Sequence, residues 1–196
     1  MRSSHIGARA VFAVLIGVLF GRAPAAAAQD LVPVTGAPVA YRVNLPGAGW
    51  NTSTENGMLM AGRDDAMIVV TATDLTTLQQ RPANVTEAQY RTVLTQRFMA
   101  SDSVMLAVMS RVVAGASTLE PEGLVKEIRT LGGQRAAYIR DHQVQSGAAK
   151  WRQAYITVKD GIMYMLVFVA RDTALDTHKD LFDRVQQSFA LAEKAR

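Results

Sequence analysis

The stretch IMYMLVFVA, residues 162–170, is apolar at every position. If it forms a strand, alternate side chains point to opposite faces of the sheet, so both faces must be buried. Burying each such side chain stabilises a protein by roughly 1.5–3 kcal/mol, and leaving one face in water would be costly. The rest of the chain therefore has to supply a cover for each face. One face would carry Ile162, Tyr164, Leu166 and Phe168, and the other Met163, Met165, Val167 and Val169.

Short strands joined by tight turns precede this stretch. The pattern predicts strands at 124–130, 134–144 and 150–158, and a meander of about four strands across 39–73. Neighbouring strands that are joined by tight turns pair antiparallel. The strands therefore predict an antiparallel sheet in which 162–170 is the central, two-sided member.

Two helical regions are available to cover the sheet. Thr86 and Gln89 form a capping-box pattern, and apolar residues then recur at helical spacing as far as residue 112. We expect one long helix or two in tandem over 86–112, with 100–103 as the point of a bend or break. A last helix is expected to begin within 172–177, with Asp176 or Thr177 as its N-cap. Its apolar stripe consists of Leu181, Phe182, Val185 and Phe189.

These elements predict an α+β fold, an antiparallel β-sheet covered by helices on both faces as an α/β/α sandwich. The 86–112 region would cover one face of the central strand, and Phe182, Val185 and Phe189 would cover the other. A second arrangement also fits the pattern. In it both helical regions lie on one face, and a partner protein covers the other.

The N-terminus has the features of a secretory signal peptide. Arg2 and Arg9 precede an apolar run over 10–21, and the small residues Ala26–Ala28 satisfy the A-x-A cleavage rule. A membrane anchor needs about 18–20 apolar residues, and the sequence Gly-Arg-Ala-Pro ends this run first. No cysteine is present to carry a lipid. We therefore expect cleavage near Ala28, a periplasmic or secreted product, and no transmembrane anchor after cleavage.

The domain organisation follows from this reading. We expect residues 1–28 to be the signal peptide, 29–38 a linker with Pro33, Gly36 and Pro38, and 39–194 a single globular domain. The formal net charge of +4 falls to +1 without Arg2, Arg9 and Arg22, because 18 basic residues then face 17 acidic ones. This balance argues against a nucleic-acid partner. The lack of cysteine excludes cysteine nucleophiles, iron–sulfur clusters and cysteine zinc sites.

Two segments of the sequence resemble the PsbP-like family. The first is Tyr41-x-Val43-x-Leu45-Pro46-x-x-x-Trp50, and the second is the strand–turn–strand–helix ending that closes in Val185-Gln186-Gln187-Ser188-Phe189. The family includes extrinsic photosystem II subunits, a Ran-binding nuclear import factor and bacterial periplasmic DcrB-like proteins, and the ending resembles the bacterial members. The resemblance implies an antiparallel sheet between helices. It supplies no shared catalytic constellation, so no catalytic residue is carried over.

Two patterns raise the question of a metal site, and for each we favour a structural interpretation. Residues 176–180 read D-T-H-K-D, but positions i, i+2 and i+4 do not share one helix face, so we interpret them as a solvated first helical turn. Met58, Met60, Met163 and Met165 could bind Cu(I) through their thioethers, but methionines in apolar runs usually fill cores. We therefore expect no metal and no cofactor.

Basic and aromatic residues alternate on the two strands before the central one. Together they would form an amphipathic patch for a partner or an anionic ligand, although an ordinary solvated sheet margin with snorkelling arginines is the alternative. The residues of this predicted patch are Arg135, Tyr138, Arg140, Lys150, Trp151, Arg152 and Tyr155.

The functional expectation is a non-catalytic exported domain that acts as an accessory or interaction protein, with another exported or envelope protein as its partner. No serine stands near a histidine in a known catalytic motif, and no glycine-rich phosphate loop precedes a helix. The first alternative is a small-ligand or lipid-binding protein with a pocket between sheet and helices, motivated by Met58, Met60, Met105 and Met109. The second is a hydrolase with an unfamiliar site.

Overall fold

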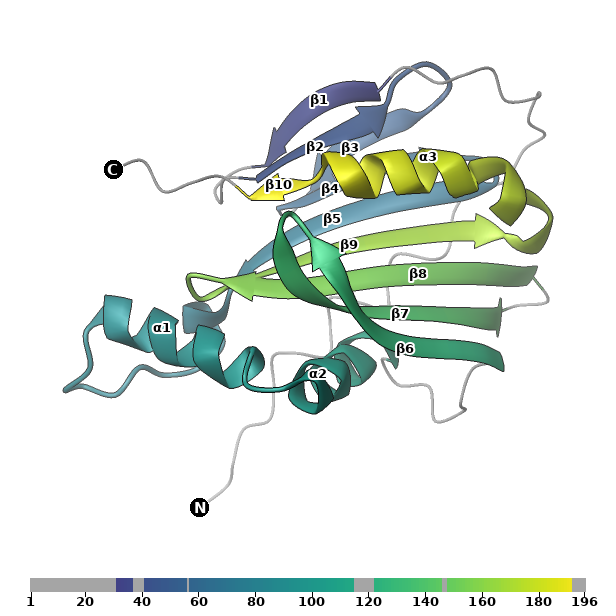
Figure 1. Cartoon of the computed structure of the whole chain (residues 1–196). Coiled ribbons are helices and arrows are strands. Elements are labelled where there is room, and N and C mark those ends of the chain that lie inside the picture. Colours follow the sequence, from purple (N-terminus) through teal and green to yellow (C-terminus); the bar gives the residue numbers. More distant parts are fainter. Residues whose placement is uncertain (1–30, 37–40, 56, 115–121, 146–147, 192–196) are drawn as a thin grey trace.

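The computed structural model describes residues 31–36, 41–55, 57–114, 122–145 and 148–191. The predicted signal peptide at 1–28 lies outside these ranges. Within them the chain forms ten strands, three α-helices and two short 3-10 helices (Figure 1). No helix of the described residues is long and apolar enough to cross a membrane.

The main sheet has seven antiparallel strands in the order β3-β4-β5-β9-β8-β7-β6. The strand β9 (Ile162–Arg171) is its central member, as predicted, and pairs along its whole length with β5 (Ala66–Asp74) and β8 (Ala148–Lys159). The remaining strands are β3 (Asn51–Glu55), β4 (Met58–Arg63), β6 (Glu122–Leu131) and β7 (Gln134–Gln145).

A second sheet of three strands contradicts two predictions. Its order is β1-β2-β10, with β1 (Leu31–Gly36), β2 (Tyr41–Pro46) and β10 (Ala190–Leu191). The predicted linker at 29–38 therefore contains a strand, and Pro33 is tolerated because β1 lies at a sheet edge, where proline is allowed. The predicted meander over 39–73 is confirmed for β3, β4 and β5, which pair in sequence order, but it is wrong for its first strand, since β2 pairs with β1 and β10 instead of β3.

The reason for the second error lies in which side chains are buried. Alternate residues of β2, Tyr41, Val43 and Leu45, are buried in a core cluster that also contains residues of the C-terminal helix. All five residues of β3 are exposed, so pairing β2 with β3 would bury nothing on the β3 side. β2 therefore joins the small sheet, where its apolar side chains are buried, although the short turn after it predicted pairing with β3.

The helical region 86–112 is two helices in tandem, α1 (Glu87–Phe98) and α2 (Asp102–Ala114). The predicted capping box is present, because Gln89 N–H donates to Thr86 Oγ1 and Thr86 N–H donates to Gln89 Oε1 at 2.9 Å. The last helix, α3 (Leu175–Ser188), follows a 3-10 turn, η2 (Asp172–Ala174). It begins within the expected range, 172–177, but the expected N-cap residues are wrong. Its N-cap is Ala174, without a side-chain cap, so Asp176 and Thr177 lie within its first turn.

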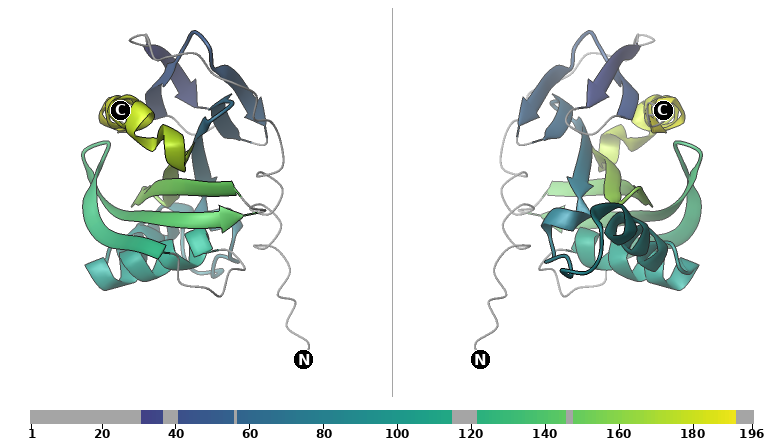
Figure 2. Two further views of the ribbon diagram at one scale, coloured as in Figure 1. Left: turned by 90° about the vertical axis from the view of Figure 1, so that its right-hand side faces the viewer. Right: turned by 90° about the vertical axis from the view of Figure 1, so that its left-hand side faces the viewer.

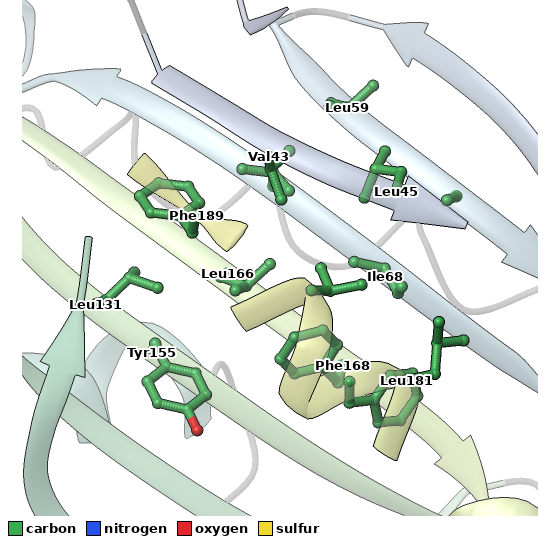
Figure 3. Packing of buried hydrophobic residues seen from close by; sticks show 14 of the residues in the cluster. Val43, Leu45, Leu59, Ile68, Leu131, Tyr155, Leu166, Phe168, Leu181 and Phe189 are labelled. Atoms are coloured by element: carbon green, nitrogen blue, oxygen red, sulfur yellow. The ribbon is translucent and has the colours of Figure 1, made fainter. Parts of the chain in front are cut away.

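Helices cover both faces of the main sheet, as predicted. On one face, α3 and the small sheet cover the even-numbered side chains of β9, including Tyr164, Leu166 and Phe168 (Figures 1 and 3). On the other face, α1 and α2 bring Phe98, Met105 and Met109 against Met165 and Val167. The two further views in Figure 2 show the sheet between these layers. We call the side that α3 covers the α3 face, and the side that α1 and α2 cover the α2 face.

The turn between β8 and β9 fixes the position of α1. Gly161 has φ +74°, and a Cβ built there would lie 2.8–3.0 Å from the side chain and Cα of Arg91. Arg91 also donates to Asp74 Oδ2 at 2.5 Å and to the Asp160 carbonyl oxygen at 3.2 Å. The missing side chain therefore lets α1 approach the turn closely.

The replacement Gly161→Ala should destabilise the protein more than Gly133→Ala. Both glycines have a φ of +74° to +77°, but nothing lies within 4 Å of a Cβ at Gly133. Left-handed backbone costs roughly 1–2 kcal/mol for a non-glycine residue, and only Gly161→Ala adds a clash with Arg91. Urea unfolding of both variants measures the difference, and equal losses would show that α1 moves away at no cost.

Candidate functional site

The seven residues of the predicted patch do not share one face of the sheet. They lie on β7 and β8 as expected, but side chains alternate along each strand. Tyr138, Arg140, Trp151 and Tyr155 lie on the α3 face, whereas Arg135, Lys150 and Arg152 lie on the α2 face. The single patch is therefore corrected to two groups with different surroundings.

The group on the α2 face is built from paired charges. Arg152 forms an ion pair with Asp141, whose side chain is 1% exposed, and its Nε donates to Asp141 Oδ1 at 3.0 Å. Arg135 forms an ion pair with Asp102 at the start of α2. Burial lowers the pKa of Lys150, and the positive charge of Arg171 lowers it further. This group joins strands and helix, which is a structural role.

The group on the α3 face begins with two tyrosines and an arginine. Tyr138 and Tyr155 are register partners whose ring centres lie 4.8 Å apart. Arg129 on β6 places its Cζ 3.7 Å from the ring centre of Tyr138 and donates to the Tyr155 hydroxyl at 3.3 Å. Its Nε donates to Glu127 at 2.6 Å. Figure 3 shows Tyr155 beside the core residues of this face, so the tyrosine rings join the core to the more exposed Arg129.

Burial keeps these tyrosines protonated. It raises the pKa of Tyr138 to about 12 against a usual value of 10, and it raises the pKa of Tyr155 as well, although the hydrogen bond from Arg129 acts in the opposite direction. Both hydroxyls are therefore neutral at physiological pH. Both tyrosines are buried, so Arg129, whose side chain is 44% exposed, is the member of this group that solvent reaches.

The stability of the protein should fall as the pH rises from 10 to 12. A folded-state pKa above the unfolded value means that the folded protein holds its proton more tightly, so this stability is complete below pH 10 and is lost as the pH passes through 12. Urea unfolding across this range measures the loss. The Tyr138→Phe variant should show a shallower decline, and an identical decline would contradict the assignment to Tyr138.

The second half of the group is centred on Trp151. The guanidinium Cζ of Arg140 lies 5.3 Å from the Trp151 ring centre, and the His142 ring lies 4.9 Å from it. His142 Nε2 lies 2.8 Å from a carboxylate oxygen of Asp172 in η2. The Nε of Arg140 is shielded from solvent and has no hydrogen-bond partner. We call Arg129, Tyr138, Arg140, His142, Trp151 and Tyr155 the α3-face cluster.

Sequence reasoning missed three members of this arrangement, Arg129, His142 and Asp172. For Arg129 and His142, the alternation of side chains along a strand could have predicted the correct face. His142 has the same parity as Tyr138 and Arg140, and Arg129 has the parity on β6 that faces Tyr138. Asp172 follows the end of β9 and reaches His142 only through the three-dimensional fold, so no local pattern indicated it.

The D-T-H-K-D pattern at the start of α3 does not assemble into a site. Asp176 and Asp180 are exposed, whereas His178 is buried and lies 3.1 Å from Asp65 and edge-on to Trp50. The prediction of a fully solvated first turn is therefore wrong for His178. Among the residues that the structure describes, no three histidine, aspartate or glutamate side chains are grouped to hold a metal ion.

The methionines named as copper or core candidates gather on one side. All of them belong to the hydrophobic cluster of the α2 face, where Met105, Met109 and Met165 are buried. Their neighbours there are apolar side chains such as Phe98 and Val167. This agrees with the interpretation of the methionines as core. Met58, Met60 and Met163 are partly buried in the same cluster, and Met67 and Met99 join them there.

The α3-face cluster lies on an antiparallel sheet between helical layers. Comparison with solved structures identifies this fold. The solution structure of cyanobacterial PsbP from Synechocystis matches 88% of this chain and 98% of its own, with a TM-score of 0.51 and 19% identity. The chain therefore has the PsbP-like fold.

Two further structures align with TM-scores below 0.5. LpqN, a protein involved in cell envelope biogenesis of Mycobacterium tuberculosis, has a TM-score of 0.47 at 16% identity and covers 85% of this chain and 93% of its own. A Pseudomonas aeruginosa protein of unknown function has 0.44 at 10% identity, with coverages of 85% and 99%. No protein-family model matches the sequence, and no curated protein sequence matches it.

Proposed function

We propose that the chain is an exported, non-catalytic accessory domain that binds another envelope protein through the α3-face cluster. The observation that carries the proposal is the way the cluster presents arginine on aromatic rings. Arg129 lies over Tyr138 and Arg140 over Trp151. Arginine, tyrosine and tryptophan are the residues most enriched at the energetic centres of protein interfaces.

The non-catalytic part of the proposal rests on the chemistry of the described residues. Each of the two described histidines lies against an aspartate, with His142 beside Asp172 and His178 beside Asp65. His178 is buried among Trp50 and Phe182, where a substrate has no access. The export part rests on the signal-peptide pattern of residues 1–28.

Site-specific photocrosslinking in the native cell tests this proposal. Thr173 is exposed in η2, next to Asp172, which contacts His142 of the cluster, so a photoreactive benzoylphenylalanine placed there should capture one partner. The matched control is the same group at Leu78, which is 60% exposed and lies beyond η1 (Leu75–Thr77). Trp151→Ala should abolish the product at Thr173. Equal capture from both positions, or capture that is unchanged in Trp151→Ala, would contradict the proposal.

The alternative of a small apolar ligand or lipid has one observation in its favour, the concentration of methionines on the α2 face. Methionine is flexible and polarisable and suits adaptable apolar binding. Met58 and Met60 of β4 are half-buried, whereas Met105 and Met109 are fully buried. Native mass spectrometry of protein purified from its own cells separates the two functions, because only the alternative expects a bound ligand mass.

A further inference from the structure

Arg140 differs from five other arginines of the fold in having no ion-pair partner among the described residues. Arg63, Arg91, Arg129, Arg135 and Arg152 each form an ion pair with an aspartate or glutamate. Within the described part of the chain, Arg140 forms no such pair, and its shielded Nε–H lacks an acceptor. A donor that is removed from water without an acceptor destabilises the fold, so this arrangement needs an explanation.

The described carboxylates of β6, β7 and η2 near Arg140 are already bound to other groups. Asp172 lies against His142, Glu127 binds Arg129, and Asp141 points to the α2 face, where it binds Arg152. The residue before Arg140 on β7, Ile139, is buried on the α2 face, and Val125 lies opposite Arg140 on β6. No described side chain around Arg140 is therefore left to neutralise it.

The guanidinium is nevertheless held in place. It stacks near the indole of Trp151, whose other contact is the His142 ring at 33° and 4.9 Å. His142 is in turn fixed by Asp172. An arginine that packs on an aromatic ring loses little freedom when it binds a ligand, because its planar donors are already oriented.

We propose that Arg140 binds a carboxylate of the partner, an aspartate or glutamate side chain that has an apolar neighbour. This inference rests on the proposed function and names the chemistry of its contact. A guanidinium matches a carboxylate through two parallel N–H···O bonds. Because Nε is shielded from solvent in the free protein, the proposed binding requires the guanidinium to move over Trp151, so that Nε–H donates to one carboxylate oxygen and gains the acceptor that it lacks. The half-buried ring of Trp151 contacts the apolar neighbour.

The charge balance favours a carboxylate over a phosphate dianion. Arg129 and Arg140 contribute two positive charges, and Glu127 removes one of them. Asp172 and Asp183, whose charge acts on Tyr155, add negative charge nearby, so a dianion would meet repulsion there. Of the two arginines, Arg140 alone has no ion-pair partner among the described residues, and its single charge matches one carboxylate.

The test uses side-chain NMR signals of the ¹⁵N-labelled protein. The probes are acetyl-Glu-Phe-amide, its uncharged counterpart acetyl-Gln-Phe-amide, and inorganic phosphate. We expect the Glu peptide to give a saturable shift of the Arg140 Nε–H and Trp151 indole signals. We expect the Gln peptide to bind about tenfold more weakly or worse, a difference that corresponds to roughly 1.4 kcal/mol. Equal binding of both peptides, or tighter binding of phosphate, overturns the assignment of a carboxylate.

Variants assign the effect to Arg140 itself. Arg140→Gln should abolish the shift at Trp151, and Arg140→Lys should weaken it, because lysine keeps the charge but loses the paired donors. Arg135→Gln is the matched control, since Arg135 lies on the same strand but faces α2. An equal loss in Arg135→Gln would overturn the inference.

Crosslinking separates this inference from the function on which it rests. A Thr173 crosslink that persists in Arg140→Gln overturns the inference and leaves the proposed function standing. A wild-type protein that gives no Thr173 product overturns the proposed function, whatever the peptides do.

Discussion

Replacing Phe168 by alanine should lower the free energy of unfolding by about 3–5 kcal/mol, the range for deleting a buried phenylalanine side chain. Phe168 lies in the middle of the central strand and is 1% exposed. Its ring stacks on Phe182 of α3 at 4.6 Å and meets Tyr155 edge-on at 6.4 Å. The alanine variant leaves a cavity where β9, α3 and β8 meet. Urea unfolding followed by circular dichroism measures the loss.

The matched control is Val169→Ala, one residue further along β9. Val169 points to the α2 face and is half-buried, so its loss should be about 1 kcal/mol, because a small, partly exposed group is removed. A loss for Phe168→Ala that is no larger than the loss for Val169→Ala would show that the α3 face collapses around the cavity.

Removing the buried carboxylate of Asp141 should cost a similar amount, about 3–5 kcal/mol for Asp141→Ala, because it leaves the charge of Arg152 buried without its aspartate. The side chains of Asp141 and Arg152 are 1% and 11% exposed, and two nitrogens of Arg152 donate to the two oxygens of Asp141. The loss is measured by urea unfolding at neutral pH.

Two further variants show whether the loss in Asp141→Ala comes from the unpaired charge of Arg152. The double variant Asp141→Leu with Arg152→Met replaces both charges by apolar groups of similar size and should recover most of the loss. Asp102→Asn breaks the exposed pair with Arg135 and should cost less than about 1 kcal/mol. A double variant as unstable as Asp141→Ala would show that the fold requires this ion pair itself.

The local patterns of the sequence predicted the main sheet and its layers. Residues 162–170 are apolar on both faces, and this alone required the two covers that α3 and the α1–α2 pair provide. The small sheet could not be predicted in this way. Its β10 has only two residues and pairs with β2 across almost the whole chain, and no local periodicity records such a pairing.

For the candidate site, the sequence indicated most of the residues but not how they are arranged in space. The basic and aromatic residues of β7 and β8 were identified, and their division between two faces follows from strand alternation once the register is known. The register itself depends on which residues of β6 and β9 lie opposite, as with Arg129 beside Tyr138. The contact between His142 and Asp172 depends on the turn after β9, which no spacing rule supplies.

The position of β9 and β10 also sets the order in which the protein can fold. The strands β5 and β8 meet only through β9, and β2 gains its second neighbour only from β10. A growing chain that ends before residue 162 therefore cannot complete either sheet. Because such distant pairings must be closed before they stabilise the chain, we expect the nascent protein to reach its complete fold only after its last segment is made, and to be incompletely folded until then. The export that we propose requires this state, since a chain that has not yet folded can be threaded through a narrow channel.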